Sequence, residues 1–409
     1  VTISLGTVKN YLSFTLICGK VMDFDESIDR RNTHSEKWDS METRYGVSAN
    51  DGIPMWIADM DFRPPQVVQD ALSNMLAHGV YGYFGDQNDY LNSIQWWMKH
   101  RHGWNVPRSG IFTTHGLVNG TAMCIDTFTD PGDGVILFTP VYHSFAKVIV
   151  ANNRQVVEME LVNNNGRYEM DFDTYDAVIP TNARMVVLCS PHNPGGRVWT
   201  RAELEQLAAF VRRHDLILVS DEIHHDLTFG IKHTPMALIE GIKDQLIMMT
   251  ATTKTFNIAG GHVGNVIIES PDLRDRFAKR MTALGLSPNA FGLHMATAAY
   301  SEGGATWLDA LVKYLDGNRK LFDAGINAIP GLKSMQLEAT YLAWVDFSRT
   351  GMAKEDFTAR VENSAKIAVN YGPTFGSGGE QFLRFNIGTT RANIELAVAK
   401  LQAAFKDLQ

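Results

Sequence analysis

The sequence is poor in cysteine, in excess positive charge and in long apolar runs, and each shortage excludes a class of protein. Cys18, Cys124 and Cys189 are widely spaced and include no Cys-x-x-Cys pair. This argues against a disulfide framework or a zinc site and fits a reducing compartment. The formal charge of -8, without a basic patch, argues against nucleic-acid or anionic-membrane partners. We therefore expect a cytoplasmic protein that acts on small molecules.

One short apolar run, residues 11–18 between Lys9 and Lys20, could be mistaken for part of a signal peptide. It is too short to span a bilayer, and no small-x-small cleavage site follows closely. We interpret residues 1–22 as an N-terminal extension and Met22 as the natural start of the chain.

The chain has 409 residues, of which 45% are hydrophobic and 20% charged, enough for a large core and two domains. Short apolar or β-branched runs alternate with helical patterns, as in 201–214, where Thr200 is a candidate N-cap. This alternation predicts a doubly wound, mostly parallel α/β sheet. The predicted strands are residues 135–139, 155–159, 185–189, 216–219, 246–250 and 263–268.

The C-terminal part of the chain has a different pattern. Long helical windows there are mixed with strand-like residues 341–347 and 382–387, which predicts a smaller α+β domain. We expect residues 63–297 to form the large domain, and residues 23–62 and 298–409 to form the small one. No internal repeat or low-complexity stretch is present.

Three polar residues each follow one of the predicted strands of the large domain. They are Asn193 in Ser-Pro-His-Asn-Pro-Gly, Asp221 in Ser-Asp-Glu-Ile-His and Lys254 in Thr-Lys-Thr-Phe-Asn. Parallel sheets bind ligands beyond the carboxyl ends of their strands. An amine, a carboxylate and an amide at this edge are the groups that hold pyridoxal phosphate, in which lysine forms the Schiff base and an acid pairs with the pyridinium nitrogen.

Each of these residues also has an ordinary structural interpretation. Lys254 alone is more often a solvated loop charge, Asp221 can cap a helix, and Asn193 fits an Asn-Pro-Gly turn. Together they favour the cofactor, because a lysine desolvated at a strand end can act as a base toward the substrate Cα proton. His224 can contact the ring or its O3′ oxygen. The adjacent His224 and His225 show no third ligand in the sequence, so we predict no metal.

Further candidates complete the predicted site. Gly116, Leu117 and Val118 begin a helix-like segment whose backbone N–H groups suit the cofactor phosphate. Tyr142 follows a strand and could lie against the cofactor ring, although such aromatics are more often core. Arg384, inside an apolar run, suits a substrate carboxylate, with a structural ion pair as the equal alternative.

These residues resemble the class I/II aminotransferase superfamily of fold-type I pyridoxal-phosphate enzymes. Residues 55–62 (Met-Trp-Ile-Ala-Asp-Met-Asp-Phe), 81–83 (Tyr-Gly-Tyr), 220–224 and 254–260 resemble the MalY/PatB-type cystathionine β-lyases. The resemblance implies a homodimer with active sites at the subunit interface and Tyr83 at the neighbouring subunit's phosphate. It also implies Lys254, Asp221 and Tyr142 as catalytic residues, with Tyr142 stacked on the ring.

Three positions depart from the family pattern at the phosphate. Ala251 stands where a serine is frequent, so that either Thr250, Thr252 or Thr253 supplies the hydroxyl or this contact to the phosphate is lost. His262 stands where many aminotransferases have a phosphate-binding arginine. His115, before Gly116, is also atypical, and nothing in the sequence explains it.

The function predicted from these roles is a carbon–sulfur β-lyase that converts L-cystathionine or related cysteine S-conjugates to thiol, pyruvate and ammonia. An aminotransferase is the alternative enzyme, because it begins with the same proton abstraction. A regulatory protein that binds pyridoxal phosphate or a partner is a third interpretation, disfavoured because binding alone needs no lysine base.

Overall fold

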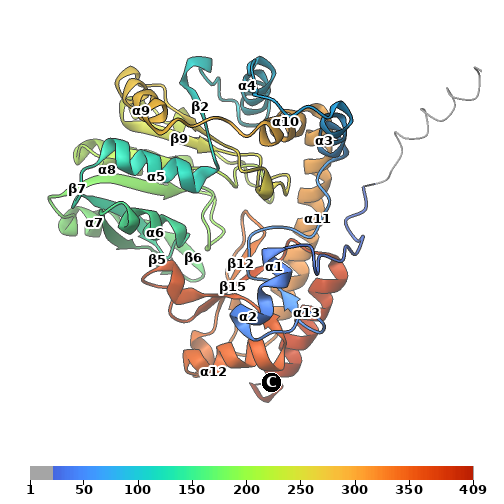
Figure 1. Ribbon diagram of the computed structural model, residues 1–409. Helices are drawn as coiled ribbons and strands as arrows, with labels where there is room; N and C mark the ends of the chain where they lie inside the picture. Colours follow the sequence, from blue (N-terminus) through green and yellow to red (C-terminus); the bar gives the residue numbers. More distant parts are fainter. Residues whose placement is uncertain (1–21, 409) are drawn as a thin grey trace, which may run out of the picture.

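The computed structural model describes residues 22–408, so the extension predicted for residues 1–22 lies outside the described residues except for Met22. A seven-stranded sheet with the order β2-β10-β9-β8-β7-β3-β4 forms the centre of the larger part (Figure 1). Its strands are β2 (Ile111–Thr114), β3 (Gly134–Thr139), β4 (Gln155–Glu160), β7 (Ala183–Cys189), β8 (Ile217–Asp221), β9 (Leu246–Thr250) and β10 (Gly264–Ile267).

The sheet is parallel except at β10, which pairs antiparallel with both β9 and β2. The predicted fold class, a doubly wound and mostly parallel sheet, is confirmed, and all six predicted strands are present. The strand β2 was missed, because two of its four residues are threonines and its apolar run is short. The direction of β10 was not predicted, because direction depends on backbone pairing and not on side-chain pattern.

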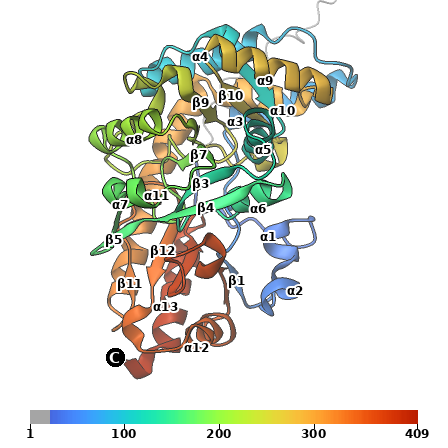
Figure 2. The same cartoon turned by 90° about the vertical axis from the view of Figure 1, so that its left-hand side faces the viewer.

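Helices cover both faces of this sheet (Figure 2). On β3, Ile136 and Phe138 belong to one buried cluster, whereas Val135 and Leu137 belong to another. This alternation is the period of two expected for a strand buried on both faces. The first face is covered by α7 (Phe172–Val178), α8 (Arg201–Arg213) and α4 (Asn88–His102), and the second by α5 (Leu117–Phe128), α6 (Ser144–Ala151) and α9 (Pro271–Leu284).

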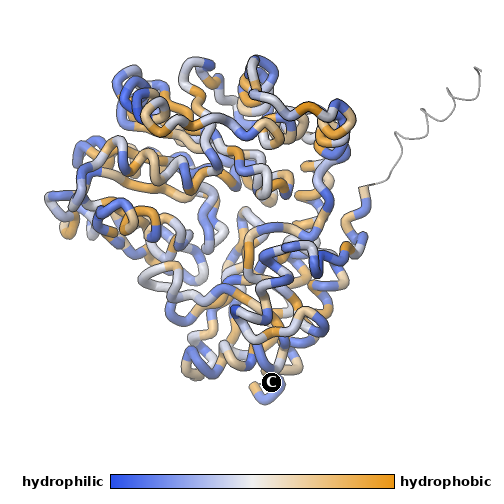
Figure 3. Tube along the Cα trace, in the orientation of Figure 1, coloured by the Kyte–Doolittle hydropathy of each residue, from blue (hydrophilic) through white to orange (hydrophobic). Residues whose placement is uncertain are grey.

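The helix α8 shows how the sequence specifies these elements. The Thr200 hydroxyl accepts a hydrogen bond from the Glu203 backbone, and the Glu203 carboxylate accepts one from the Thr200 backbone, which is a capping box. Its buried face carries Leu204, Leu207 and Val211. Figure 3 shows the resulting alternation of hydrophobic and hydrophilic residues along the outer helices.

The C-terminal part contains an antiparallel sheet with the order β11-β12-β15-β14. Its strands are β11 (Lys333–Ser334), β12 (Leu342–Asp346), β14 (Asn370–Tyr371) and β15 (Phe382–Asn386), and its helices include α11 (Glu302–Asn327), α12 (Lys354–Ala359) and α13 (Arg391–Ala404). The two strands predicted here correspond to β12 and β15.

The N-terminal segment joins this C-terminal part. The strand β1 (Ile53–Pro54) pairs in parallel with β13 (Ile367–Ala368), and α1 (Glu36–Asp39) and α2 (Met41–Tyr45) lie beside that part of the molecule (Figures 1 and 2). The boundaries at residues 62 and 298 stay a prediction. The remaining helices are α3 (Gln66–His78) and α10 (Ala290–Ala299). Across residues 22–408, no helix has the length and apolarity needed to cross a membrane.

Candidate active site

A cavity of about 530 Å³ lies at the carboxyl ends of β7, β8 and β9. Asn193, Asp221 and Lys254, which follow or end these strands, all line it. The convergence follows from topology, because neighbouring parallel strands end at the same edge of the sheet. The other predicted residues in its wall are Gly116, Leu117, Val118, Tyr142, His224, Thr253 and His262.

Lys254 lies in the loop after β9, partly buried, and its Nζ donates a hydrogen bond of 2.6 Å to the Ala58 carbonyl. Burial lowers the pKa of this amine to about 8, and the positive charge of Arg384 contributes, while the carboxylates of Asp59 and Asp221 act in the opposite direction. A part of the amine population is therefore unprotonated near neutral pH, as a base requires.

Asp221 is the last residue of β8, and only 5% of it is exposed. Its Oδ1 accepts one hydrogen bond, 3.1 Å long, from the Ile223 backbone. No lysine, arginine or histidine within residues 22–408 forms an ion pair with it. Burial raises the pKa of this carboxyl to about 7, with a small contribution from Glu222. A turn follows β8 in place of a helix, so Asp221 is not a helix cap.

Arg384 lies in β15, 2% exposed, and does not line the cavity directly. Its Nη1 donates 3.0 Å to Asn193 Oδ1, and its Nη2 donates 2.8 Å to the Trp56 carbonyl and also bonds Asn370 Oδ1. Its Nε has no acceptor, and no acidic side chain in the described part of the chain pairs with it. Burial lowers the pKa of the guanidinium to about 10.

The bond from Arg384 also orients Asn193. Since the amide oxygen of Asn193 accepts from Arg384, the amide nitrogen is left to donate toward the cavity. His224 contributes a second uncommitted group, because its Nδ1 is buried without a partner among residues 22–408. Burial, together with the positive charges of Lys254 and Arg384, lowers the pKa of His224 to about 3, so the imidazole is neutral.

The start of α5 forms another part of the wall. Gly116 is its N-cap with φ of +89°, and a Cβ there would meet open space. The positive φ favours glycine, and the first N–H groups of the helix, those of Leu117 and Val118, have no intrahelical partner. The N-terminus of a twelve-residue helix therefore points its dipole and free donors at the cavity.

Among the positions that depart from the family pattern, His262 lines the cavity and Ala251 does not, and Thr253, a candidate to supply the missing hydroxyl, also lines it. His115 also lines it, with its Nε2 2.9 Å from the Ser287 carbonyl. Tyr142 lines it with its ring edge-on to His143 and Phe145. Tyr83 is fully exposed and lies outside the cavity.

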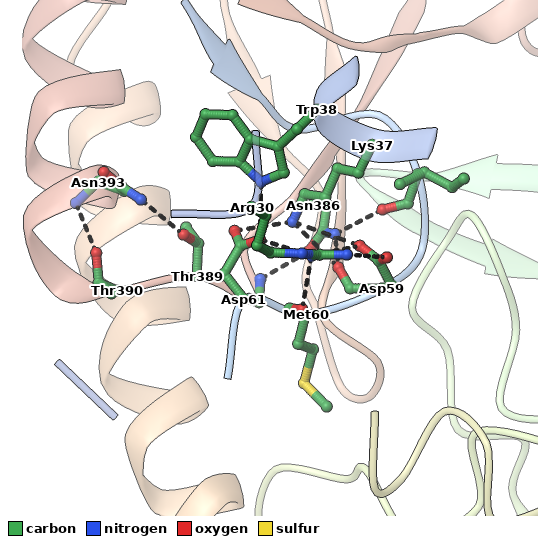
Figure 4. Close-up of polar contacts among 12 residues, drawn as sticks. Arg30, Lys37, Trp38, Asp59, Met60, Asp61, Asn386, Thr389, Thr390 and Asn393 are labelled. Atoms are coloured by element: carbon green, nitrogen blue, oxygen red, sulfur yellow. Dashed lines mark hydrogen bonds and ion pairs between the residues drawn. The ribbon is translucent and has the colours of Figure 1, made fainter. Parts of the chain in front are cut away.

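Sequence reasoning missed the role of the segment Ala58–Asp61. Its Ala58 carbonyl accepts from Lys254 and from the Tyr341 hydroxyl at 3.0 Å. Figure 4 shows how Arg30, Lys37 and Asn386 surround the segment. The motif 55–62 was recognised in the resemblance, but the sequence has no signal that its backbone faces the lysine. Cys189, Asn119 and Ile223 also line the cavity unpredicted.

A family model and close relatives define the class of this protein. Residues 51–401 match the model "Aminotransferase class I and II". The chain belongs to this family, and its fold is that of the fold-type I pyridoxal-phosphate-dependent enzymes.

Within the family, the chain is similar to carbon–sulfur lyases. It is 36% identical to cystathionine beta-lyase PatB of Bacillus subtilis, over 94% of this chain and 100% of the relative. It is 32% identical to Protein MalY of Escherichia coli, over 94% and 99%. The crystal structure of cystalysin from Treponema denticola, which contains a pyridoxal 5'-phosphate cofactor, matches with a TM-score of 0.90 and 36% identity, over 95% of this chain and 100% of that one. The resemblance predicted from the motifs is confirmed.

Proposed function

We propose that this protein is a pyridoxal-phosphate-dependent carbon–sulfur β-lyase acting on L-cystathionine or related cysteine S-conjugates. The observation that carries the proposal is a buried carboxylate without a cation, Asp221, across one cavity from a lysine base, Lys254. PatB and cystalysin support the lyase chemistry, since each covers almost the whole chain.

The residues present fit the cofactor. Asp221 lacks the cation that a protonated pyridine nitrogen would supply, and the free donors of α5 suit a phosphate. The uncommitted Nδ1 of His224 and the amide nitrogen of Asn193 suit the ring oxygen. Thr253 and His262 would add to the phosphate contacts, and Tyr142 would lie along the ring.

When bound, pyridoxal phosphate supplies an aldehyde for the substrate amine and a ring that withdraws electrons from the substrate Cα. Lys254 Nζ accepts the proton from Cα, and Asp221 holds the positive charge at the ring nitrogen. Arg384 lies one hydrogen bond behind Asn193 in the cavity wall, and its guanidinium, whose Nε is free, would bind the substrate α-carboxylate. Because these groups are buried, their charges act in a low dielectric, where such interactions are strong.

The overall reaction breaks the Cβ–S bond and releases the sulfur as a thiol. The remaining three-carbon unit takes up one water and gives pyruvate and ammonia. No oxidant or reductant is needed, because Cβ is reduced when its bond to sulfur is replaced by a bond to hydrogen, and Cα is oxidised to the same extent when it becomes the ketone carbon.

We also infer a homodimer in the cytoplasm. The exposed aromatic Tyr83 lies outside its own chain's cavity, and Val80 and Tyr81 nearby are exposed as well. An apolar surface of this kind suits a second copy of the chain, whose phosphate Tyr83 would reach. The free, buried thiols of Cys124 and Cys189 suit a reducing compartment.

The test is to incubate the protein with pyridoxal phosphate and L-cystathionine, without a keto acid, and to follow pyruvate and thiol. Equal amounts of both over many turnovers support the lyase. The alternative function is that of an aminotransferase, because the matched family also contains these enzymes. In that case, turnover would stop after one equivalent and would resume when a keto acid is added. If neither product forms and no cofactor binds, the proposal is wrong.

A further inference from the structure

A buried polar cluster, which we call the Asp226 cluster, lies behind the wall of the cavity and has no part in the mechanism above. It consists of Trp97, His102, His225, Asp226 and Thr255, all less than 9% exposed. Asp226 is its centre. Trp97 Nε1 lies 3.1 Å from each carboxylate oxygen, His102 Nε2 is 2.8 Å from Oδ1, and His225 Nε2 and Thr255 Oγ1 are 3.1 Å and 3.0 Å from Oδ2.

The composition of the cluster resembles that of a metal site. Ligand atoms of His102, His225 and Asp226 lie within 4.8 Å of one another. However, the carboxylate already accepts from the Trp97 indole, which can only donate, and from the Thr255 hydroxyl. Its charge is held by the imidazoles, because His225 and His102 keep the pKa of Asp226 well below its usual range although burial alone would raise it. Hydrogen bonds from Trp97, His102 and Thr255 thus satisfy the carboxylate of Asp226 without an ion, while His225 Nε2 approaches it at ion-pair distance only.

What distinguishes the Asp226 cluster is the set of segments that it joins. Asp226 lies five residues after Asp221, in the same loop as His224, whereas Thr255 directly follows Lys254. The single bond from Thr255 to Asp226 therefore ties the loop that carries the carboxylate to the loop that carries the base. Trp97 and His102, both on α4, bond Asp226 and so fasten the loop after β8 to that helix, whereas the lysine loop is attached to it through Thr255.

The lysine loop has a second anchor on its other side. The Asn257 side chain accepts 2.8 Å from the Met60 backbone N–H and donates 2.9 Å and 2.7 Å to the Met60 and Phe62 carbonyls. Lys254 is thus close to two fixed points, Thr255 and Asn257. Active-site groups must be held within about 0.5 Å of the productive geometry, and a displacement of about 1 Å can cost 100-fold in rate.

We propose that Asp226 and Thr255 are positioning residues for the reaction, which hold the Lys254 amine in register with Asp221 through their mutual hydrogen bond. The inference rests on the proposed function, because it assigns these residues to the same base. Neither residue lines the cavity, and the polar side-chain atoms of both are engaged within the Asp226 cluster, so we assign them no contact with the substrate.

The experiment compares Thr255→Val with Thr255→Ser in the protein loaded with pyridoxal phosphate. Valine keeps the shape but removes the hydroxyl, whereas serine keeps the hydroxyl. We expect Thr255→Val to lower kcat for L-cystathionine about tenfold with KM changed less than about twofold, and Thr255→Ser to restore most of kcat. Asp226→Asn should resemble Thr255→Val.

Thr129→Val is the matched control. The Thr129 hydroxyl is also buried and donates 2.6 Å to the Ile125 carbonyl, at the far end of α5 from the cavity. The Thr129→Val variant should be less stable than the wild type but should have the same kcat. The proposal is overturned if Thr255→Val keeps wild-type kcat, if Thr129→Val loses as much, or if the purified protein holds one equivalent of a transition metal that Asp226→Asn removes.

A spectroscopic readout separates this inference from the proposed function. The absorbance of the cofactor bound to Lys254 is followed against pH, without substrate. Thr255→Val should move the midpoint by about half a pH unit or more, because the environment of Nζ changes, and Thr255→Ser should restore it. If the wild type gives no pyruvate, the proposed function fails and this midpoint alone decides the inference. An unchanged midpoint then overturns it. If Thr255→Val does not fold, the same comparison is made with Asp226→Asn.

Discussion

Two ionic regions contact the segment Ala58–Asp61, and the pKa values of their charged groups are shifted in opposite directions. The first, which we call the strap cluster, consists of Arg30, Lys37, Asp59 and Asp61 (Figure 4). The second is the cavity with Asp221, Lys254 and Arg384. Asp61 and Asp221 are buried to a similar degree, so the comparison of these two carboxylates isolates the effect of partners.

In the strap cluster every charge is matched. Lys37, fully buried, has its Nζ 2.9 Å from Asp61, and Arg30 lies 2.7 Å from Asp59 and 2.9 Å from Asp61. Although burial alone would raise it, the pKa of Asp61 is lowered by Lys37 and Arg30. Burial alone would lower the pKa of Arg30, but its bonds to Asp59 and Asp61 raise it. Asp61 and Arg30 therefore stay ionised.

In the cavity each shift has the opposite sign. The pKa of Asp221 rises to about 7, and those of Lys254 and Arg384 fall to about 8 and about 10, in each case chiefly through burial. The difference shows that burial shifts the pKa of an unpaired group toward favouring its neutral form, and that a charged partner reverses the shift. Asp221, Lys254 and Arg384 form no ion pair within residues 22–408, which suits groups whose charged partners are a cofactor and a substrate.

The largest effect is expected from removing the base of the cavity. Lys254→Ala should lower turnover of L-cystathionine by at least about 10³-fold, because both the cofactor attachment and the proton acceptor are lost. Lys400→Ala is the control, since Lys400 is only partly buried and donates its hydrogen bond, among residues 22–408, to the Asp51 carbonyl. Pyruvate release measures both, and wild-type turnover by Lys254→Ala would contradict the assignment.

The next largest effect is expected from removing one charge of the strap cluster. Asp61→Asn should lower the free energy of unfolding by about 3–5 kcal/mol, because the buried Lys37 ammonium loses its partner. Asp309→Asn breaks the exposed pair with Arg101 and should change stability by less than about 1 kcal/mol. Urea unfolding gives both values. Equal losses in the two variants would refute the contrast between matched and unmatched regions.

A third change should have the opposite sign, because the pKa of folded Asp221 lies above its unfolded value of about 3.9. The native state binds the extra proton, so this group costs stability as pH rises from about 4 through about 7. In the cofactor-free protein, Asp221→Asn should therefore add roughly 2–4 kcal/mol of stability at pH 8.5 relative to wild type. The gain should be smaller at pH 5. A gain independent of pH, measured by urea unfolding, would argue against an unmatched carboxylate.

The smallest effect is expected at Arg384. Arg384→Ala should raise KM for L-cystathionine by a factor that corresponds to about 1.5–3 kcal/mol, through the loss of a charge-assisted hydrogen bond. Arg384→Lys keeps the charge without the guanidinium fork and should fall between alanine and wild type. Steady-state kinetics with pyruvate detection measures the series, and an unchanged KM in Arg384→Ala would remove this residue from the substrate site.

The predicted site and the observed cavity agree for the residues that follow the parallel strands. Asn193, Asp221 and Lys254 could be brought together from sequence because parallel neighbouring strands share an edge. Gly116 could be predicted at a helix start from its place before an apolar helical pattern, and it is the N-cap of α5. These inferences are local or follow from topology alone.

Other contacts could not be predicted, since they join segments that have no local relationship. The Ala58 carbonyl meets Lys254 across 196 positions, and His102 meets Asp226 across 124. The sequence showed His224 and His225 without a third group, whereas folding brings His102 and Asp226 to His225. Side-chain type gives no information about such pairs before the chain is folded.

By itself, the sequence determined the doubly wound sheet, the family and the polar residues at the carboxyl edge of that sheet, because strand periodicity is encoded locally and the edge follows from the strand order. Only the tertiary structure decided which buried charges are matched. Asp61 and Asp221 are both buried aspartates beside apolar runs, yet Lys37 and Arg30 reach the first and no cation of the described chain reaches the second. The electrostatic state of a buried group depends on the distances to its neighbours in space, and those distances exist only in the folded chain.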